Sequence, residues 1–461
     1  MRGTIVFGAG LALRLALIAM YPLIFAGDPM LRLLHRDQVL LSHQLPLLQL
    51  VVYGIARITH DYVVTQWAMA SIGAAAGAAF YLLARDLFEE RAAFLAALLL
   101  TTNPLVAAVS IVPFQESLML ATLFLAFHFF YTEKMGLASV FLALACFTRF
   151  EAWAAAPVLA AAYIWRRGMS PSVVARGLIL FGWAPALWIA YQRGLAPAGS
   201  YVVESHLSLA RFMRWMYLGY ITAKFTPVIV LALGVIGLWI LWRDRQRWIP
   251  RLWPLVVFFV LFAAALLFSA HGDWPDPERR IASREAHLWI AAVVILAALA
   301  LEKMPRYRML LVAAAVAFGA WGAYGYVKRE ASDPHLLLSY RLAKFLDTAL
   351  QPGERALILA PPWPSHFFDF YLERARETGG EAGYQAAVRN LAESDMSPPS
   401  YQRTLIHSRF DRDRLLSDPG ACTAWIAVWS DYSSPPRDLP KPETMLRAGD
   451  LSVSVFRRNC L

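Results

Sequence analysis

The chain has 461 residues, of which 58% are hydrophobic and only 16% are charged, and its mean hydropathy is +0.47. A soluble domain is typically about half apolar and about a quarter charged, so this composition excludes an ordinary soluble protein and predicts an integral membrane protein. The formal net charge of +10 fits Lys and Arg in cytoplasmic loops and a preference for anionic lipid or phosphate. We expect no nucleic acid as partner, because the sequence has no long run of Lys or Arg.

The apolar segments predict a polytopic bundle. A spanning helix needs about 20 mostly apolar residues, and the first such run, residues 4–25, is longer than the apolar region of a signal peptide, so we expect an uncleaved anchor. About eleven spans are expected in all. They cover residues 4–25, 63–84, 92–112, 114–131, 137–147, 152–165, 173–192, 225–242, 252–270, 287–301 and 309–326. The two between 137 and 165 form either a bent hairpin or one continuous helix.

Short basic connections predict the orientation. With the N-terminus inside, the connections at residues 85–91, 133–134, 166–167, 243–247 and 302–306 face the cytoplasm, in keeping with the excess of Lys and Arg in cytoplasmic loops. The loops on the opposite side also carry arginines. Either some spans are assigned to the wrong side, or the outer face has a basic cavity for an anionic head group.

Residues 327–461 predict a separate domain, because the apolar runs stop after residue 326. Residues 336–350 have helical spacing, 366–378 and 383–393 resemble helices, and 356–360, 424–429 and 451–456 resemble strands. This alternation predicts a soluble α/β domain. The predicted fold is therefore mainly α: a transmembrane helical bundle over residues 1–326, followed by an extracytoplasmic α/β domain over residues 327–461.

The three cysteines predict no metal site, since Cys146, Cys422 and Cys460 lack metal-ligand spacing. Cys422 and Cys460 flank the last two predicted strands in a compartment that permits disulfides. We expect free buried thiols, and a Cys422–Cys460 bridge is the alternative.

The loop after the first span is the first candidate site. Asp28 lies at the expected membrane edge, where an ionisable group is costly and usually functional, and a carboxylate there can act as a general base. The alternative is a simple Asp-Pro turn that ends the helix. Arg36 and Asp37 form either a solvated pair or a second acid that orients the substrate. His43 precedes the next apolar run.

Three charged residues interrupt apolar segments at expected outer turns. Glu116 opens a helix, where an acid favours the helix N-terminus; alternatively, it faces the Asp28 loop and holds a sugar hydroxyl or a divalent cation. Arg149 and Glu151 either neutralise one another, or Arg149 binds a phosphate and Glu151 orients it.

A basic segment precedes the span at 287–301. Arg280, Arg284 and His287 converge at the predicted helix start, where the arginine fork and the helix dipole both suit phosphate. Neighbouring acids dilute this signal, so a solvated charged loop is the alternative. Because the sequence has no glycine-rich phosphate loop or dinucleotide motif, we expect a lipid-linked phosphate rather than a nucleotide as substrate.

The order of these features resembles the GT-C superfamily of polyprenyl-phosphate-sugar glycosyltransferases, above all its protein-mannosyltransferase and aminoarabinose-transferase type. Asp28 matches the acid of the first outer loop, and His43-Gln-Leu-Pro-Leu-Leu48 resembles the His-Pro-Pro-Leu entry to the next helix. Residues 82–96, Glu116 and residues 284–289 also match in order. The sequence departs from the mannosyltransferases because Pro29 replaces their second adjacent acid, and because only Pro46 represents the two prolines.

The resemblance implies that an acceptor attacks the anomeric carbon of a lipid-linked sugar with inversion. Asp28 would be the base, and Glu116 and Asp37 supporting acids. The substrate- and phosphate-binding residues would be Arg36, His43, Arg149, Glu151, Arg280, Arg284 and His287. No cofactor is expected with certainty, and a divalent cation stays open. The expected partners are the polyprenyl-phosphate sugar, an unidentified acceptor and membrane lipids, in a bacterial inner membrane.

Two other classes stay open. A transporter or flippase of an isoprenoid-linked glycan would use the same arginines without a base, although the internal repeat typical of transporters is not evident. A non-catalytic scaffold would leave Asp28, Glu116 and Arg149 without a role.

Overall fold

The structure is a computed structural model that describes residues 1–20, 29, 32–33, 36, 38–40, 45–59, 62–195, 209–268, 281–349, 355–359, 405–406, 423–430 and 441–457. The chain folds into two compact units. The first, the helical unit, contains Met1–Leu17, Val39–Val51 and Trp67–Tyr326, and the second contains Ile18–Gln38, Val52–Gln66 and Val327–Leu461. The assignment of residues 1–326 to catalysis and of 327–461 to an extracytoplasmic domain stays a prediction.

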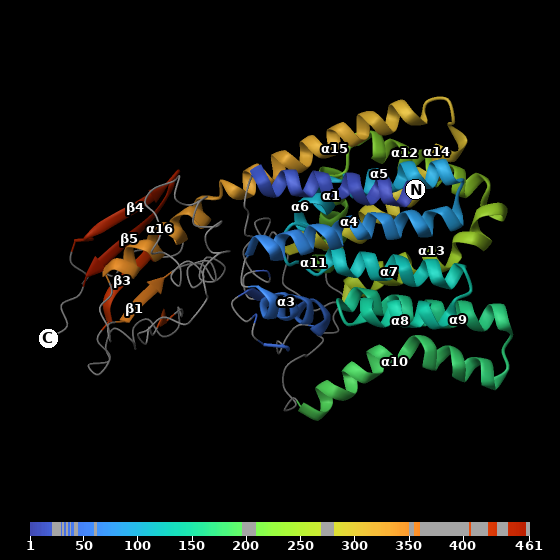
Figure 1. Cartoon of the computed structure of the whole chain (residues 1–461), viewed down its shortest axis with the longest axis horizontal. Helices are drawn as coiled ribbons and strands as arrows, with labels where there is room; N and C mark the ends of the chain where they lie inside the picture. The colour runs from blue at the N-terminus through green and yellow to red at the C-terminus, as the bar shows by residue number, and fades with distance from the viewer. Residues whose placement is uncertain are drawn as a thin grey trace. The chain divides into compact units, whose positions relative to one another are not determined.

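Helices make up most of the described chain (Figure 1). They are α1 Arg2–Met20, α3 Pro46–Ile58, α4 Tyr62–Leu87, α5 Glu90–Thr101, α6 Pro104–Val109, α7 Glu116–Tyr131, α8 Met135–Cys146, the 3-10 helix η1 Phe150–Ala154, α9 Ala155–Arg167, α10 Pro171–Leu195, α11 Leu209–Phe225, α12 Val228–Arg243, α13 Arg245–Phe268, α14 Ile281–Lys303, α15 Arg308–Ala331 and α16 Pro334–Ala349. Each of the expected spans is mostly helical in its described part, which confirms a mainly helical fold.

Within the described residues, six helices are long and apolar enough to cross a membrane. The pair α11–α12, bent by 120°, would make a seventh, and α3, α7 and α8 are shorter apolar helices. The sequence analysis expects about eleven spans, and the difference arises because several of them are shorter or broken helices in the structure. A multi-pass membrane protein remains the class that these helices indicate.

Two sequence expectations about the helices are wrong. The expected span 92–112 is broken into α5 and α6, because the Asn103 carboxamide oxygen accepts hydrogen bonds from Leu105 N (3.1 Å) and Val106 N (3.3 Å) and Pro104 occupies the first helical position. The stretch 193–224, between two expected spans, is not predicted to be helical, but it contains most of α11. Its basic residues interrupt the apolar run, so the sequence pattern did not predict the helix.

The segment between α8 and α9 settles an alternative that the sequence leaves open. Arg149 has an extended backbone (φ −148°, ψ 147°), which separates the two helices. Lys134 precedes α8, and the guanidinium of Arg166 at the end of α9 lies over the ring of Phe130. Since the start of α8 and the end of α9 lie in the same region, this segment is a helical hairpin.

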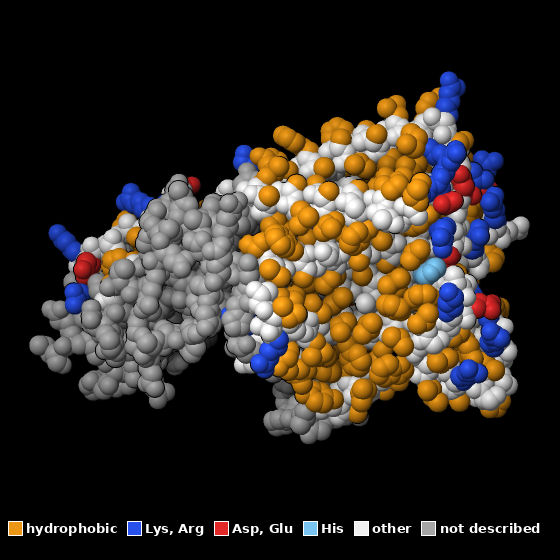
Figure 2. All heavy atoms as spheres, in the orientation of Figure 1, with side chains coloured by type: hydrophobic (Ala, Val, Ile, Leu, Met, Phe, Trp, Pro, Cys, Tyr) orange, Lys and Arg blue, Asp and Glu red, His pale blue; other side chains and the backbone are white. Residues whose placement is uncertain are grey.

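The basic connections of the helical unit meet at one end, called here the charged end. It comprises residues 85–91, 131–134, 166–167, 243–251 and 302–308, joined by contacts such as Arg308–Glu89 (2.7 Å), Arg247–Glu302 (3.4 Å) and Tyr131 Oη to Arg251 O (3.0 Å). Figure 2 shows charged side chains gathered at one end of this unit and hydrophobic ones along its length. The sequence analysis places these same connections on one side of the membrane. Which side of the membrane they face stays a prediction.

A single buried guanidinium ties α1 to the break between α5 and α6. Arg14 has no exposed surface and donates to Ser110 Oγ (2.6 Å), Gly10 O (2.9 Å), Thr101 O (3.2 Å), Thr101 Oγ1 (3.3 Å) and Val106 O (3.5 Å). Thr101 is the last residue of α5, where carbonyls lack intrahelical partners. Apolar surroundings offer those carbonyls no water, so Arg14 satisfies them and places a cation at the negative end of a helix.

Close helix packing in this unit depends on glycine at two positions. A Cβ added to Gly73 on α4 would lie 2.6 Å from Arg14 Nε, and one added to Gly237 on α12 would lie 1.8 Å from Leu296 O on α14. Small residues let helix backbones approach closely in membranes. These two glycines therefore make room for the Arg14 side chain and for the contact between α12 and α14.

The second unit contains a five-stranded sheet in the order β2-β1-β3-β5-β4. The strands are β1 Arg355–Leu359, β2 Leu405–Ile406, β3 Thr423–Trp429, β4 Thr444–Ala448 and β5 Leu451–Arg457. β1 pairs in parallel with β2 and β3, whereas β5 pairs antiparallel with β3 and β4. Gly449, at φ +57°, allows the two-residue turn between β4 and β5. Helix α16 packs on β4 and β5.

The described part of this unit confirms an α/β domain and the three strands that the sequence predicts. It adds β2 and β4, which are short. The predicted helices at 366–378 and 383–393 lie outside the described residues, as do Cys422 and Cys460, so the bridge between these cysteines stays a prediction. Cys146 is buried and free.

We predict that Gly237→Ala destabilises the helical unit by about 1–3 kcal/mol, because a methyl group there meets the α14 backbone and the two helices must separate. The measurement is the thermal unfolding midpoint of the purified protein in detergent. Gly182→Ala on α10 is the matched control, since nothing lies within 4 Å of a Cβ at Gly182, and it should be neutral or slightly stabilising. Equal midpoints for the two variants would contradict the packing argument.

We predict that Arg14→Met lowers the free energy of unfolding by at least about 1–3 kcal/mol, because the carbonyl of Thr101 would stay buried without its donor. Arg14→Lys keeps the charge, but its single ammonium group cannot span Thr101 and Ser110 together, so an intermediate loss is expected. Thermal unfolding in detergent measures both variants. A fully stable Arg14→Met protein would show that the break between α5 and α6 is held by other contacts.

Candidate functional site

Helix α7 places Glu116 at the end of the bundle opposite the charged end. Tyr131, at the last position of α7, contacts the charged end through Arg251 O. Glu116 lies fifteen residues earlier in the same helix, which at 1.5 Å per residue corresponds to about 22 Å. The residue is only 1% exposed. An acid in the first turn of a helix is favoured by the helix dipole, so the local sequence explains its position.

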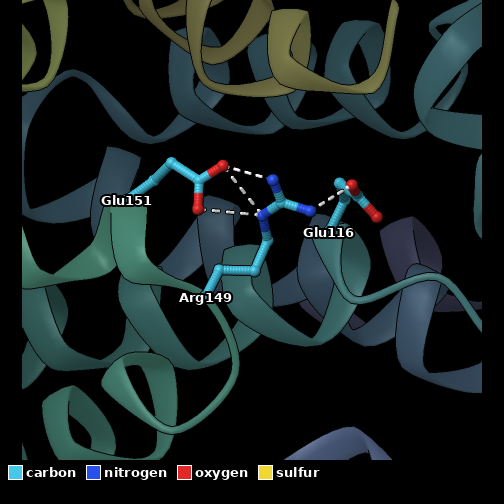
Figure 3. Close-up of polar contacts among 3 residues, drawn as sticks. All are labelled: Glu116, Arg149 and Glu151. Atoms are coloured by element: carbon cyan, nitrogen blue, oxygen red, sulfur yellow. Dashed lines mark hydrogen bonds and ion pairs between the residues drawn. The ribbon is translucent and has the colours of Figure 1, made fainter. Parts of the chain in front are cut away.

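Arg149 contacts two glutamates from two different elements (Figure 3). Its Nη1 donates to Glu116 Oε1 at 2.6 Å, and its Nε lies 3.0 Å from each carboxylate oxygen of Glu151. A further hydrogen bond joins Nη2 to Glu151 Oε1. Each of the three guanidinium nitrogens therefore contacts a carboxylate. These three residues are called here the Glu116–Arg149–Glu151 cluster.

The cluster is largely removed from solvent. The side chains of Glu116, Arg149 and Glu151 are 1%, 14% and 17% exposed. Charge-assisted hydrogen bonds of the arginine fork are stronger than neutral ones, and low polarity strengthens them further. The cluster thus fixes the start of α7 to the turn of the α8–α9 hairpin.

The turn that carries Arg149 also contacts the start of α3. Leu47 N, at the start of α3, donates to Phe147 O at 3.0 Å. Arg149 N donates to Ala145 O at 3.1 Å. Leu47 belongs to the segment His43–Leu48 that the sequence analysis singled out. The structure therefore brings the described end of that segment to the turn of the cluster.

His287 lies at the same depth of the bundle as Glu116. It is 1% exposed and precedes Glu302, a residue of the charged end, by fifteen residues of α14, again about 22 Å at helical rise. Helices α7 and α14 contact one another and run in the same direction. Glu116 and His287, two candidate site residues on separate helices, therefore lie at the same end of the unit.

The structure describes only some of the other candidate site residues. Arg284 lies in the first turn of α14. Arg36 is buried at 6% exposure in the second unit. Asp28, Asp37, His43 and Arg280 lie outside the described residues, so their roles stay predictions. The expectation that Asp28 shares a cavity with Arg149, Arg284 or His287 stays a prediction for the same reason.

Sequence reasoning paired Arg149 with Glu151 but missed the contact between Arg149 and Glu116. The available signal was that both residues interrupt apolar segments at turns expected on the same side of the membrane. Sequence reasoning also missed Arg14, which lies inside the first span. A lone basic residue within an apolar run was the signal, because such a residue usually faces the bundle interior.

A divalent cation finds no ready ligand set in the described part of the chain. No three side chains of His, Cys, Asp or Glu lie close enough there to hold a metal ion. Both acids of the cluster contact the Arg149 guanidinium, which competes with a cation for them. The divalent cation left open by the sequence stays a prediction.

Comparisons with known proteins find similarity in structure. No family model matches the sequence, and no curated protein matches it. Apo ArnT from Cupriavidus metallidurans aligns over 99% of this chain and 98% of its own, with 15% identity and a TM-score of 0.60. ArnT bound to undecaprenyl phosphate aligns over 98% and 97%, with 14% identity and a TM-score of 0.57.

A weaker similarity, with a TM-score of 0.49 and 15% identity, joins 80% of this chain to 61% of the Archaeoglobus fulgidus oligosaccharyltransferase complex with Zn and sulfate. The match with ArnT extends over nearly the whole of both chains, and so includes the helical bundle and the C-terminal sheet together. The chain therefore has the fold of the GT-C glycosyltransferases, as the order of its sequence features predicts.

Proposed function

We propose that this chain is a membrane glycosyltransferase that moves a sugar from a polyprenyl-phosphate donor to an acceptor at the outer face of the membrane. The observation that carries the proposal is the buried Glu116–Arg149–Glu151 cluster, at the end of the bundle opposite the charged end. The fold supports it, because the ArnT structure of the same fold binds undecaprenyl phosphate.

The reaction follows from the chemistry of a lipid-linked sugar. An acceptor oxygen or nitrogen attacks the anomeric carbon, a new glycosidic bond forms, and the bond from that carbon to the phosphate oxygen breaks. The acceptor proton passes to a carboxylate base, for which we propose Asp28 on its position in the sequence. Polyprenyl phosphate leaves with the bonding electrons, and attack from the opposite face inverts the anomeric centre.

Arg149 acts in this proposal as a positioning residue. Each of its nitrogens contacts a carboxylate, so a phosphate would have to compete with Glu116 or Glu151 for it. Its role is to orient Glu116 toward a hydroxyl group of the sugar or acceptor. Stabilisation of the departing phosphate falls to cations at the start of α14, for which we propose Arg280, Arg284 and His287. Arg36, Asp37 and His43 complete the donor site from the first loop.

Buried ion clusters favour this proposal over a scaffold. Taking charged groups out of water is costly, and a buried ion pair is often no more stabilising than a well-packed apolar substitute. A scaffold gains nothing from burying these charges, so it would not be expected to keep them. A flippase would use the same phosphate-binding cations but no base, so the two classes differ in whether a glycosidic bond forms.

We predict that Asp28→Asn lowers the transfer rate by about 10²–10⁴-fold, the usual contribution of a general base, while the protein stays folded and binds the donor. The assay is transfer from a radiolabelled polyprenyl-phosphate sugar in detergent, with donor binding measured in parallel. Near wild-type turnover would rule out Asp28 and direct attention to Asp37 or Glu116. Donor translocation across vesicles without any transfer by the wild-type protein would favour the flippase.

We predict that Arg149→Lys lowers kcat much more than it weakens donor binding, because lysine cannot contact both carboxylates in the same geometry. Arg167→Lys is the matched control, since Arg167 makes only a long, exposed contact with Glu133 at 3.8 Å. Transfer kinetics and donor affinity are compared for both variants. A loss confined to donor affinity would instead make Arg149 a direct phosphate ligand.

A further inference from the structure

Each acid that the structure describes at the charged end contacts a basic side chain of the protein. Their ion pairs are Asp86–His128 (2.6 Å), Glu89–Arg308 (2.7 Å), Glu90–Arg2 (3.2 Å), Glu133–Arg167 (3.8 Å), Asp244–Lys303 (3.6 Å) and Glu302–Arg247 (3.4 Å). The described acids of this end are therefore already in ion pairs. Further cations at this end can interact with solvent, lipid or another molecule.

Five exposed cations at this end have no carboxylate partner in the described chain, and each lies over an aromatic ring. They are Arg85 over Tyr81 (6.0 Å), Lys134 over Phe129 (5.9 Å), Arg166 over Phe130 (4.6 Å), Arg243 over Trp239 (5.2 Å) and Arg306 over Tyr307 (5.5 Å). All five distances fall within the range of a cation–π contact. This set is called here the cation–aromatic collar.

The collar is contributed by separate connections of the helical unit. Its cations come from the ends of α4, α9 and α12 and from the turns α7–α8 and α14–α15. Trp239 and Tyr307 are 53% and 52% exposed. Tyr and Trp gather at membrane–water interfaces, with the ring at head-group level. Tyr81 and Phe130 are buried, but the two exposed rings indicate that Arg243 and Arg306, and with them this end of the unit, lie at the depth of lipid head groups, where the apolar sides of the bundle end (Figure 2).

We infer that the cation–aromatic collar binds the phosphate-bearing head groups of anionic phospholipids in the leaflet at this end. Basic residues next to a membrane surface are attracted to anionic lipid, and the collar cations are not neutralised by acids of the described chain. Each ring supports its cation from one side and leaves hydrogen-bond donors free for a phosphate. A nucleic acid or acidic protein fits less well, because the collar borders surface that faces lipid tails.

This inference is independent of the proposed function, since a flippase or a scaffold of this fold would carry the same collar. It also bears on orientation. Because the cytoplasmic leaflet carries the anionic lipids that attract basic segments, we expect the charged end to face the cytoplasm and the Glu116–Arg149–Glu151 cluster to face outward.

The test compares two variants of the full chain with the same change in charge. The collar variant carries Arg85→Gln, Arg166→Gln, Arg243→Gln and Arg306→Gln. The control variant carries Arg91→Gln, Arg176→Gln, Arg245→Gln and Arg251→Gln. These control residues are exposed arginines of the helical unit that have neither a carboxylate partner nor a ring contact within the described residues. Both proteins are reconstituted in nanodiscs of phosphatidylcholine and phosphatidylglycerol.

The measurement is the protein-bound fraction of spin-labelled phosphatidylglycerol relative to spin-labelled phosphatidylcholine. We expect the wild-type protein to prefer the anionic lipid and the collar variant to lose about threefold or more of this preference, whereas the control variant keeps most of it. Salt should weaken the wild-type preference. Equal losses of lipid preference in the two variants would show that only net charge matters and would overturn the collar as a site. A collar variant with an unchanged lipid preference would also overturn it.

A conservative variant keeps the test decisive if the collar variant fails to fold. Lysine at the same four positions retains the charges and should retain the preference for phosphatidylglycerol. The single changes Arg243→Gln and Arg306→Gln should each lower the preference in part. A lysine variant that folds but shows no preference would overturn the inference.

Discussion

The helical unit depends on satisfying the backbone where the helix between residues 92 and 112 breaks. An interrupted helix at this depth exposes carbonyl and amide groups that lipid cannot hydrogen-bond. Asn103 supplies an acceptor for two amides of α6 and donates to Phe225 O (3.0 Å), and Arg14 supplies donors for the carbonyls of Thr101 and Val106. With these partners, the break is tolerated in an apolar interior and α6 has a fixed direction.

That fixed direction determines where the candidate site lies. Helix α6 ends at Val109, and Ser110, which accepts from Arg14 at 2.6 Å, begins the short connection to Glu116. Arg149 then holds Glu116 from the other side at 2.6 Å. Arg14 and the partly buried Arg149 therefore define the start of α7, Arg14 through the Ser110 hydroxyl and Arg149 through the Glu116 carboxylate. A site built from groups fixed in this way loses little entropy when a substrate binds.

The sequence predicted what depends on local pattern. Apolar runs located the spans, and alternation located β3 and β5, because burial imposes those periods on nearby residues. Contacts between distant residues were beyond it: Arg14 meets Ser110 across 96 residues, and Arg149 meets Glu116 across 33. Local composition also misled, since basic residues hid α11. The charged residues of the cluster were nominated correctly as unusual, but their mutual arrangement required the fold.

The two ends of the bundle use charge in opposite ways, and the difference bears on function. At the charged end, pairs such as Glu133–Arg167 are exposed, and exposed pairs contribute about 0–1 kcal/mol, so stability does not require them. There the cations serve an interface with the surroundings. At the other end, Glu116 is held within the protein at 1% exposure. Burying a carboxylate at that depth is costly without a cation beside it, and Arg149 contacts Glu116 at 2.6 Å. The cost of a charge thus depends on its access to water, which the pairs at the charged end have and Glu116 does not.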